Sequence, residues 1–134
     1  MEQSQADTGT GWAASSLDRL GEGPGFRKIR PAIGVEEMGV NAIVLPPRYQ
    51  AGSHWHEKQE EVYFVHEGKV TFLFGDGESC VVSTGGVIRV DAKTHRQVRN
   101  EEETTATIVV FGAQGGYIGR DGQPGDASGG FLDA

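Results

Sequence analysis

Short runs of β-branched and aromatic residues, separated by turn-forming residues, dominate the chain between residues 26 and 111. This pattern is typical of a small all-β domain, since such residues favour strands and glycine, aspartate and asparagine favour the reversals between them. Strands are expected at residues 26–29, 38–45, 54–55, 61–65, 70–74, 79–82, 86–90, 97–99 and 105–111. A spacing of about ten residues per strand indicates a sandwich or a barrel. No segment beyond residue 20 has sustained helical periodicity, so little helix is expected.

The two ends of the chain differ from this central region. Residues 1–24 are mostly polar and predict an N-terminal tail with one short ordered element, a turn of helix at residues 16–20. Residues 117–134 are rich in glycine, which favours a C-terminal tail. The expected organisation is therefore a barrel over residues 25–116 between two tails.

Composition excludes several classes of protein. The chain has 21 glycines in 134 residues without a three-residue period, which excludes a collagen-like fibre. Its net charge of −7 and the lack of a large basic cluster argue against a nucleic-acid partner. No apolar stretch approaches the roughly 20 residues that span a bilayer, so no membrane partner is expected. A single cysteine, Cys80, cannot form a disulfide within the chain, which fits a cytoplasmic location. The expected partner is a small neutral or polar molecule.

Three of the four histidines fall within the 13 residues from His54 to His66. Residues two apart in a strand point to the same side, so His54 and His56 can offer ring nitrogens to a common point. Glu61, on the next predicted strand, can add a carboxylate. Two histidines and one carboxylate leave coordination positions open, which suits divalent iron, manganese, nickel or cobalt more naturally than a closed structural zinc site. Alternatively, His54 and His56 are a solvated pair of histidines on the protein surface.

The same segment resembles the first signature of the cupin superfamily, in which His-X-His is followed by three or four residues, a Glu, six residues and a Gly. Here four residues separate His56 from Glu61 and six separate Glu61 from Gly68, while Arg48 stands where the signature opens with Gly. The resemblance implies a double-stranded β-helix, a jelly-roll-like barrel of two antiparallel sheets. It also implies a divalent transition metal (Fe, Mn, Ni, Co or Zn) held by His54, His56, Glu61 and a fourth histidine.

The second cupin signature, which supplies that fourth histidine, is only partly matched. Between Gly85 and Asn100 the length agrees, but Arg96 stands where the ligand histidine belongs. His95 is one residue away and can be the fourth ligand only if the turn at residues 92–94 is one residue shorter, because side chains alternate along a strand. Alternatively, Arg96 points inward, which implies either an anionic ligand between it and the metal or an ion pair with Glu61 that replaces the metal.

The remaining pocket residues are predicted from their positions. Tyr63 shares the parity of Glu61 and should line the pocket, and Phe72 and Phe111 are expected there too. Gln59 lies near Glu61 in the predicted turn, either as a hydrogen-bond donor or an extra ligand at the metal or, as we expect, as a solvated turn residue.

Two classes of function stay open. The first is a metal-dependent enzyme, such as a dioxygenase or an isomerase, and the fold alone does not choose between them. The second is a non-catalytic module that binds a small molecule, with its metal site lost or replaced by a Glu61–Arg96 ion pair. The resemblance also implies a homodimer formed through N-terminal strands such as residues 26–29.

Overall fold

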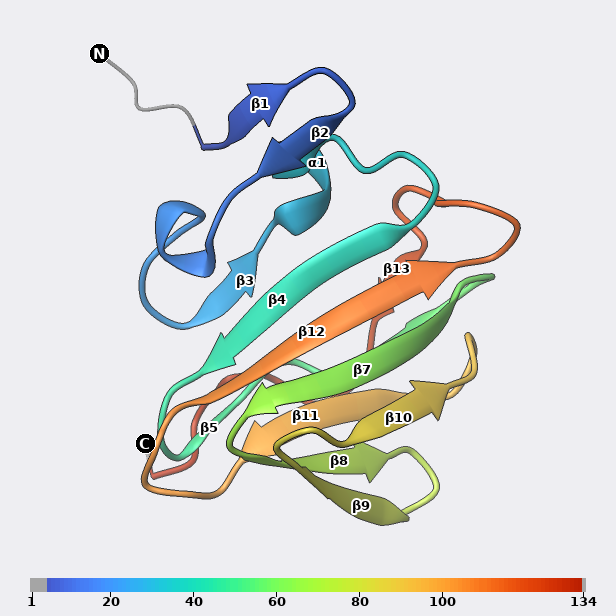
Figure 1. The fold of residues 1–134 in the computed structure, drawn as a ribbon. Helices are drawn as coiled ribbons and strands as arrows, with labels where there is room; N and C mark the ends of the chain where they lie inside the picture. Colours follow the sequence, from blue (N-terminus) through green and yellow to red (C-terminus); the bar gives the residue numbers. More distant parts are fainter. Residues whose placement is uncertain (1–4, 134) are drawn as a thin grey trace.

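A computed structural model describes residues 5–133, which form two large antiparallel sheets packed face to face (Figure 1). The five-stranded sheet has the order β10-β7-β12-β4-β3, and the seven-stranded sheet has the order β13-β6-β11-β5-β14, with β8 and β9 attached through β11. The first sheet contains β3 (Gly25–Arg27), β4 (Gly39–Leu45), β7 (Glu60–Glu67), β10 (Val87–Val90) and β12 (Ala106–Ala113). The second contains β5 (Tyr49–Gln50), β6 (His54–His56), β8 (Lys69–Phe74), β9 (Ser79–Ser83), β11 (Arg96–Asn100), β13 (Gly122–Pro124) and β14 (Gly130–Phe131). The predicted all-β class is confirmed.

Alternation of side chains builds the core between the two sheets. Along β7, Glu61, Tyr63 and Val65 are buried while Glu60 and Val62 are exposed. The core cluster comprises Ile43, Leu45, Tyr63, Val65, Val70, Phe72, Val82, Val90, Val98, Ala106, Ile108 and Val110. Each of the larger apolar side chains in this cluster contributes about 1.5–3 kcal/mol through removal of its surface from water. The same alternation that fills the core therefore turns Glu61 into the barrel.

One turn between strands has a strict requirement for glycine. Gly68 joins β7 to β8 with φ +99°, a conformation that side chains with a Cβ rarely adopt. A Cβ at this position would lie 2.8 Å from the Cβ of Ala106. The glycine that closes the first cupin-like signature is thus demanded both by backbone conformation and by close packing.

The C-terminal segment differs from the expected tail. β13 pairs with β6 in the register Gly122↔His56, and β14 pairs with β5. The glycine-rich residues beyond 116 therefore add two strands to the barrel. They do so through backbone hydrogen bonds, which leave no apolar pattern in the sequence.

The N-terminal segment has more structure than a tail with one turn. Asp7–Gly9 (β1) and Trp12–Ala14 (β2) form a hairpin, and a 3-10 turn at Leu17–Arg19 falls within the predicted turn of helix. A short helix, α1 (Ile29–Ile33), follows β3 and is too short for helical periodicity to reveal. No helix among residues 5–133 is long and apolar enough to cross a membrane.

Candidate metal centre

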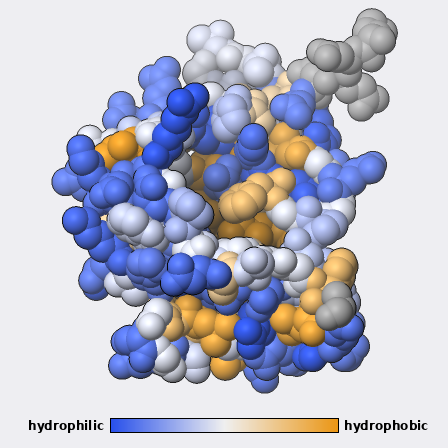
Figure 2. Space-filling view, turned by 180° about the vertical axis from the view of Figure 1, so that it is seen from behind, coloured by the Kyte–Doolittle hydropathy of each residue, from blue (hydrophilic) through white to orange (hydrophobic). Residues whose placement is uncertain are grey.

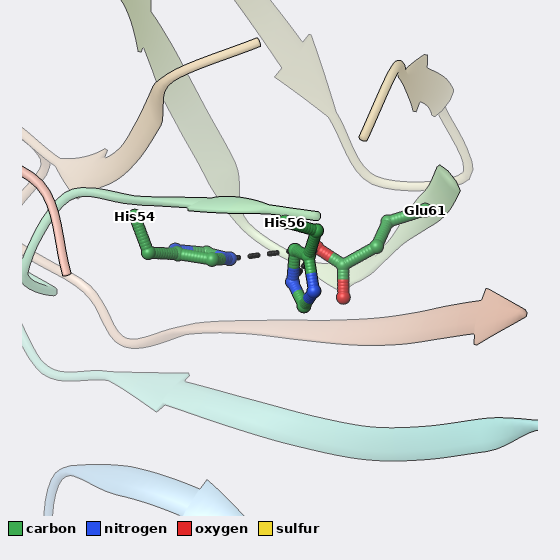
Figure 3. Close-up of side chains that lie close together, drawn as sticks. All are labelled: His54, His56 and Glu61. Atoms are coloured by element: carbon green, nitrogen blue, oxygen red, sulfur yellow. Dashed lines mark hydrogen bonds and ion pairs between the residues drawn. The ribbon is translucent and has the colours of Figure 1, made fainter. Parts of the chain in front are cut away.

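His54, His56 and Glu61 converge inside the barrel (Figure 3). β6 carries both histidines on one side, and its pairing with β13 and β11 fixes the strand. Trp55, between them, points to the opposite side. Glu61 comes from β7 in the facing sheet, so the site bridges the two layers. The spacing in the sequence correctly predicted this juxtaposition.

The distances among these side chains suit one metal ion. Nε2 of His54 lies 3.4 Å from Oε1 of Glu61, and Nε2 of His56 lies 3.3 Å from the same oxygen. The candidate ligand atoms of the three residues all lie within 4.8 Å of one another. Ligands at about 2.0–2.2 Å from a first-row ion, at angles between about 90° and 110°, lie roughly 3–3.5 Å apart. The two nitrogen-to-oxygen distances therefore fit this range, and the three side chains could hold a metal ion.

Hydrogen bonds hold Glu61 in its ionised form. Burial on its own would raise the pKa of this carboxyl, but its interactions with His54, His56 and Tyr63 outweigh burial and the pKa lies well below its usual value. The Tyr63 hydroxyl donates to Oε1 at 2.6 Å. Burial, with the charge of Glu61, raises the pKa of Tyr63 far above its usual value. Glu61 is thus a carboxylate and Tyr63 a neutral donor.

Arg96, and not His95, reaches this site from β11. Its side chain has no exposed surface, and its Nη2 donates to Glu61 Oε1 at 3.2 Å. Nε donates to the Tyr63 hydroxyl at 3.3 Å, and Nη1 donates to the carbonyls of Ala92 and Thr94 at 3.1 and 2.6 Å. All three guanidinium nitrogens are therefore hydrogen-bonded. The Glu61–Arg96 ion pair considered from the sequence is present.

His95, the predicted fourth ligand, lies away from the other three. It is exposed and stacks on Trp55 with ring centroids 5.6 Å apart and planes 18° apart. The turn before β11 is not shortened, so strand alternation places His95 on the outer side with Trp55 and Arg96 on the inner side. Within residues 5–133, the side chains that could hold a metal together are therefore His54, His56 and Glu61.

Asp121, which nothing in the sequence singled out, lies directly behind His56. Its Oδ2 is 3.3 Å from His56 Nδ1, a buried nitrogen that forms no aligned hydrogen bond. The backbone N–H groups of Lys58 and Gln59 donate to Asp121 and fix it, with Gln59 N at 2.7 Å. Burial raises the pKa of Asp121, but these hydrogen bonds and His56 outweigh burial and lower it. A carboxylate in this position favours a proton on Nδ1 and leaves the Nε2 lone pair for a metal.

The centre lies at the base of a half-open cleft with two branches. The larger branch has a volume of about 400 Å³ and an apolar wall of Phe26, Ile43 and Val110 above His54, His56, Glu61 and Tyr63. The smaller branch, about 160 Å³, runs from His56 and Glu61 past Gln59 and Asp121 to Tyr117 and Arg120. Figure 2 shows an apolar hollow with a hydrophilic rim on the face of the molecule opposite to that of Figure 1.

The predicted pocket residues occupy different places. Tyr63 lines the larger branch and Gln59 the smaller, where Gln59 Oε1 accepts a hydrogen bond from the backbone N–H of Ile118 at 3.0 Å. Phe72 is fully buried behind the site and packs edge-on against Tyr63. Phe111 points outward and is 39% exposed, because the pairing of β12 turns Val110 inward instead.

Comparison with known proteins gives one family and several similar structures. A family model described as a cupin domain matches residues 42–112. The structure of TT1209 from Thermus thermophilus shares 28% identity with a TM-score of 0.63, over 78% of this chain and 98% of that chain. A cupin-superfamily sugar phosphate isomerase from Silicibacter pomeroyi shares 25% identity with a TM-score of 0.60, over 66% of this chain and 58% of that chain, which is less than two thirds of its length.

A third structure resembles this chain in fold alone. It is an uncharacterised protein with a double-stranded β-helix domain from Klebsiella pneumoniae, with 15% identity and a TM-score of 0.71, over 84% of this chain and 96% of that chain. A search of curated proteins gives no match.

Proposed function

Because this chain belongs to the cupin family, and because His54, His56 and Glu61 converge in its barrel, we propose that it binds a divalent transition metal and presents the ion to a small molecule in the cleft. The observation that supports this most strongly is the pair of histidine Nε2 atoms at 3.3 and 3.4 Å from one carboxylate oxygen. Both branches of the cleft reach His56 and Glu61, so a bound ion would face a ligand from either branch.

The residues around the site have separate tasks in this proposal. A bound ion would supply Lewis-acid chemistry, or redox chemistry if it is iron or manganese, at coordination positions that the protein leaves open. Asp121 orients His56, and Tyr63 and Arg96 hold Glu61 in place. The neutral Tyr63 hydroxyl donates to Glu61 and so is not a general base. Phe26, Ile43 and Val110 exclude water from one side of a bound molecule.

Isomerisation is the reaction that we propose to assay first. The Silicibacter protein named as a sugar phosphate isomerase shares 25% identity with this chain. A sugar–phosphate isomerase moves a proton between neighbouring carbons and requires polarisation of a carbonyl, which a Lewis acid with open positions supplies. Dioxygenase activity uses the same open positions and is the second reaction to assay.

The Glu61–Arg96 ion pair favours a second candidate function. Arg96 neutralises Glu61 without an ion, at an Nη2 to Oε1 distance of 3.2 Å. A barrel whose buried carboxylate is already paired does not depend on a metal for its electrostatic balance. In this alternative the cleft binds a small molecule without a metal and without turnover.

Metal uptake distinguishes the two candidates. The full chain, purified without a metal-affinity step, is exchanged with Fe²⁺, Mn²⁺, Ni²⁺, Co²⁺ or Zn²⁺ and its metal content is measured by elemental analysis. We expect near-stoichiometric metal in the wild type and in His95→Ala, and loss of the metal in His56→Ala. His95 is a matched control because it is a histidine on the outer side of the same sheet. Equal metal content in all three proteins, or none in any, would overturn the metal proposal.

A further inference from the structure

Three cationic side chains line the smaller branch of the cleft and the groove beside it. Arg120 lines this branch together with His56 and Glu61. Lys28 and Arg30 line an adjoining groove of about 320 Å³, which shares Gly39, Asn41 and Tyr117 with the smaller branch. The two spaces therefore adjoin at these residues, with the candidate metal centre beside one space and two basic residues beside the other.

Within the part of the chain that the structure describes, these three cations form no ion pair with a carboxylate. Among residues 5–133, no Asp or Glu oxygen lies within 4.0 Å of the charged nitrogens of Lys28, Arg30 or Arg120. The arginines that do form ion pairs are Arg19, Arg48, Arg89, Arg96 and Arg99. Glu61 and Asp121 line the smaller branch beside Arg120, but no acidic residue that the structure describes lines the groove of Lys28 and Arg30, so positive charge is in excess on that side. Such an excess inside a cleft concentrates anions there.

Arg120 has a backbone conformation that is unusual for a residue other than glycine. Its φ is +56°, in the left-handed region that glycine adopts freely, and glycines stand nearby at Gly119 and Gly122. The next residue, Asp121, is anchored behind His56 by two backbone N–H groups. Arg48 has a similar φ of +55° and pairs with Asp133, whereas Arg120 lies beside the cleft, where its guanidinium can reach a ligand.

Tyr117, which lines both spaces, holds Arg30 in the adjoining groove. The guanidinium carbon of Arg30 lies 4.0 Å from the centroid of the Tyr117 ring, a cation–π contact that keeps the planar group on the ring face. Only one of its N–H groups has a hydrogen bond in the described residues, from Nη1 to the Val35 carbonyl at 3.5 Å. Its other N–H groups are left to bind a ligand, in the fork geometry that suits phosphate and carboxylate.

We propose that the cleft binds a small organic anion whose phosphate or carboxylate group is held by Arg120, Arg30 and Lys28. The position of the other end of this molecule, at His54, His56 and Glu61, rests on the proposed metal function. The buried charges at that end agree with the choice. The positive charge of a divalent ion and of Arg96 together would exceed the negative charge of Glu61 and Asp121. The loaded site would therefore attract an anion more strongly than a neutral molecule.

Binding of simple probes tests the proposal. Isothermal titration of the full chain uses glycerol 3-phosphate and succinate as anionic probes and glycerol as the neutral probe, with and without bound Mn²⁺. We expect glycerol 3-phosphate or succinate to bind the wild type at least tenfold more tightly than glycerol, and the tighter of the two identifies the preferred anionic group. Equal affinity for the three probes, or none for either anion, would overturn the proposal.

Variants at Arg120 separate charge from folding. Arg120→Gly removes the charge and also relieves the positive φ, so its melting temperature should equal or exceed that of the wild type while anion affinity falls at least fivefold. Arg120→Lys keeps the charge and should retain more of the affinity. Lys69→Gln, at the start of β8 and outside the cleft residues, is the control for loss of one exposed cation and should change affinity less than twofold. Unchanged affinity in Arg120→Gly would overturn the assignment of Arg120.

The titrations with and without Mn²⁺ distinguish this proposal from the proposed function. Anion binding that occurs without Mn²⁺ and falls in Arg120→Gly supports the basic site even if no metal binds. Metal uptake with no anion binding supports the metal centre and overturns the basic site.

Discussion

Replacement of Arg96 by methionine tests the electrostatic account of the barrel interior. Arg96 has no exposed side-chain surface, and it donates to Glu61, Tyr63 and two backbone carbonyls. Methionine has a similar length but no charge, so in Arg96→Met the ionised Glu61 loses its cationic partner. Removal of one partner of a buried ion pair costs about 3–5 kcal/mol, because the remaining charge is left uncompensated in a poorly solvated place.

The expected loss is large compared with the total stability of the domain. A chain of this size has a free energy of unfolding of about 5–15 kcal/mol, so the metal-free variant should lose roughly a fifth or more of it. The melting temperature should fall by about 10–20 °C. Urea and thermal unfolding followed by circular dichroism measure the two quantities in metal-free buffer with chelator. Arg99→Met is the matched control on the same strand, since Arg99 pairs at 3.6 Å with Glu101 near the surface and should cost about 1 kcal/mol or less.

A second substitution identifies Glu61 as the source of the loss. In Glu61→Gln/Arg96→Met the uncompensated charge is absent. The double variant should therefore lose less free energy of unfolding than the two single variants lose in sum. Excess metal should also restore part of the stability of Arg96→Met, because an ion on Glu61 replaces the missing cation. A loss below about 1 kcal/mol in metal-free Arg96→Met, or strict additivity with Glu61→Gln, would refute the reasoning.

Three further predictions concern positions around the barrel. Asp121→Asn should weaken metal affinity about 10–100-fold in a titration with Co²⁺, whereas Asp126→Asn, exposed in the same segment, should leave it unchanged; equal affinities would contradict the role of Asp121 behind His56. Gly68→Ala should lower the free energy of unfolding by more than Gly77→Ala. Both glycines have a positive φ, but of the two only Gly68 has an atom within 3 Å of the added Cβ. Equal losses in urea unfolding would show that the packing around Gly68 is irrelevant. The homodimer that the cupin resemblance implies should give about twice the 14.3 kDa chain mass in light scattering after gel filtration, and the monomer mass would reject the dimer.

Side-chain alternation explains how much of this fold could be predicted. The long strands β4, β7, β8 and β12 lie where runs of β-branched and aromatic residues predicted them, because each buries one face in the core. The strands β13 and β14 could not be predicted in this way. Their residues are mostly glycine and polar, and they join the sheet through backbone hydrogen bonds with one aromatic contact, between Phe131 and Tyr49.

Side-chain alternation also explains which residues of the candidate site could be predicted. His54, His56 and Glu61 were predictable because their spacing in two strands fixes which side each faces. The choice between His95 and Arg96 was open, since it depends on the length of one turn and a shift of one residue reverses every side chain. Phe111 was assigned to the pocket without a known register, and the pairing of β12 turns it outward. Asp121 reaches His56 from a distant part of the chain, through a segment with no apolar pattern.

A crystal structure of the Mn²⁺-soaked protein, with anomalous difference density, tests the central claim most directly. We expect one strong peak per chain at about 2.0–2.2 Å from Nε2 of His54, Nε2 of His56 and a carboxylate oxygen of Glu61, with Arg96 still paired to Glu61. A barrel without such a peak, in which the Arg96 guanidinium occupies the point between the two histidines, would contradict the metal centre.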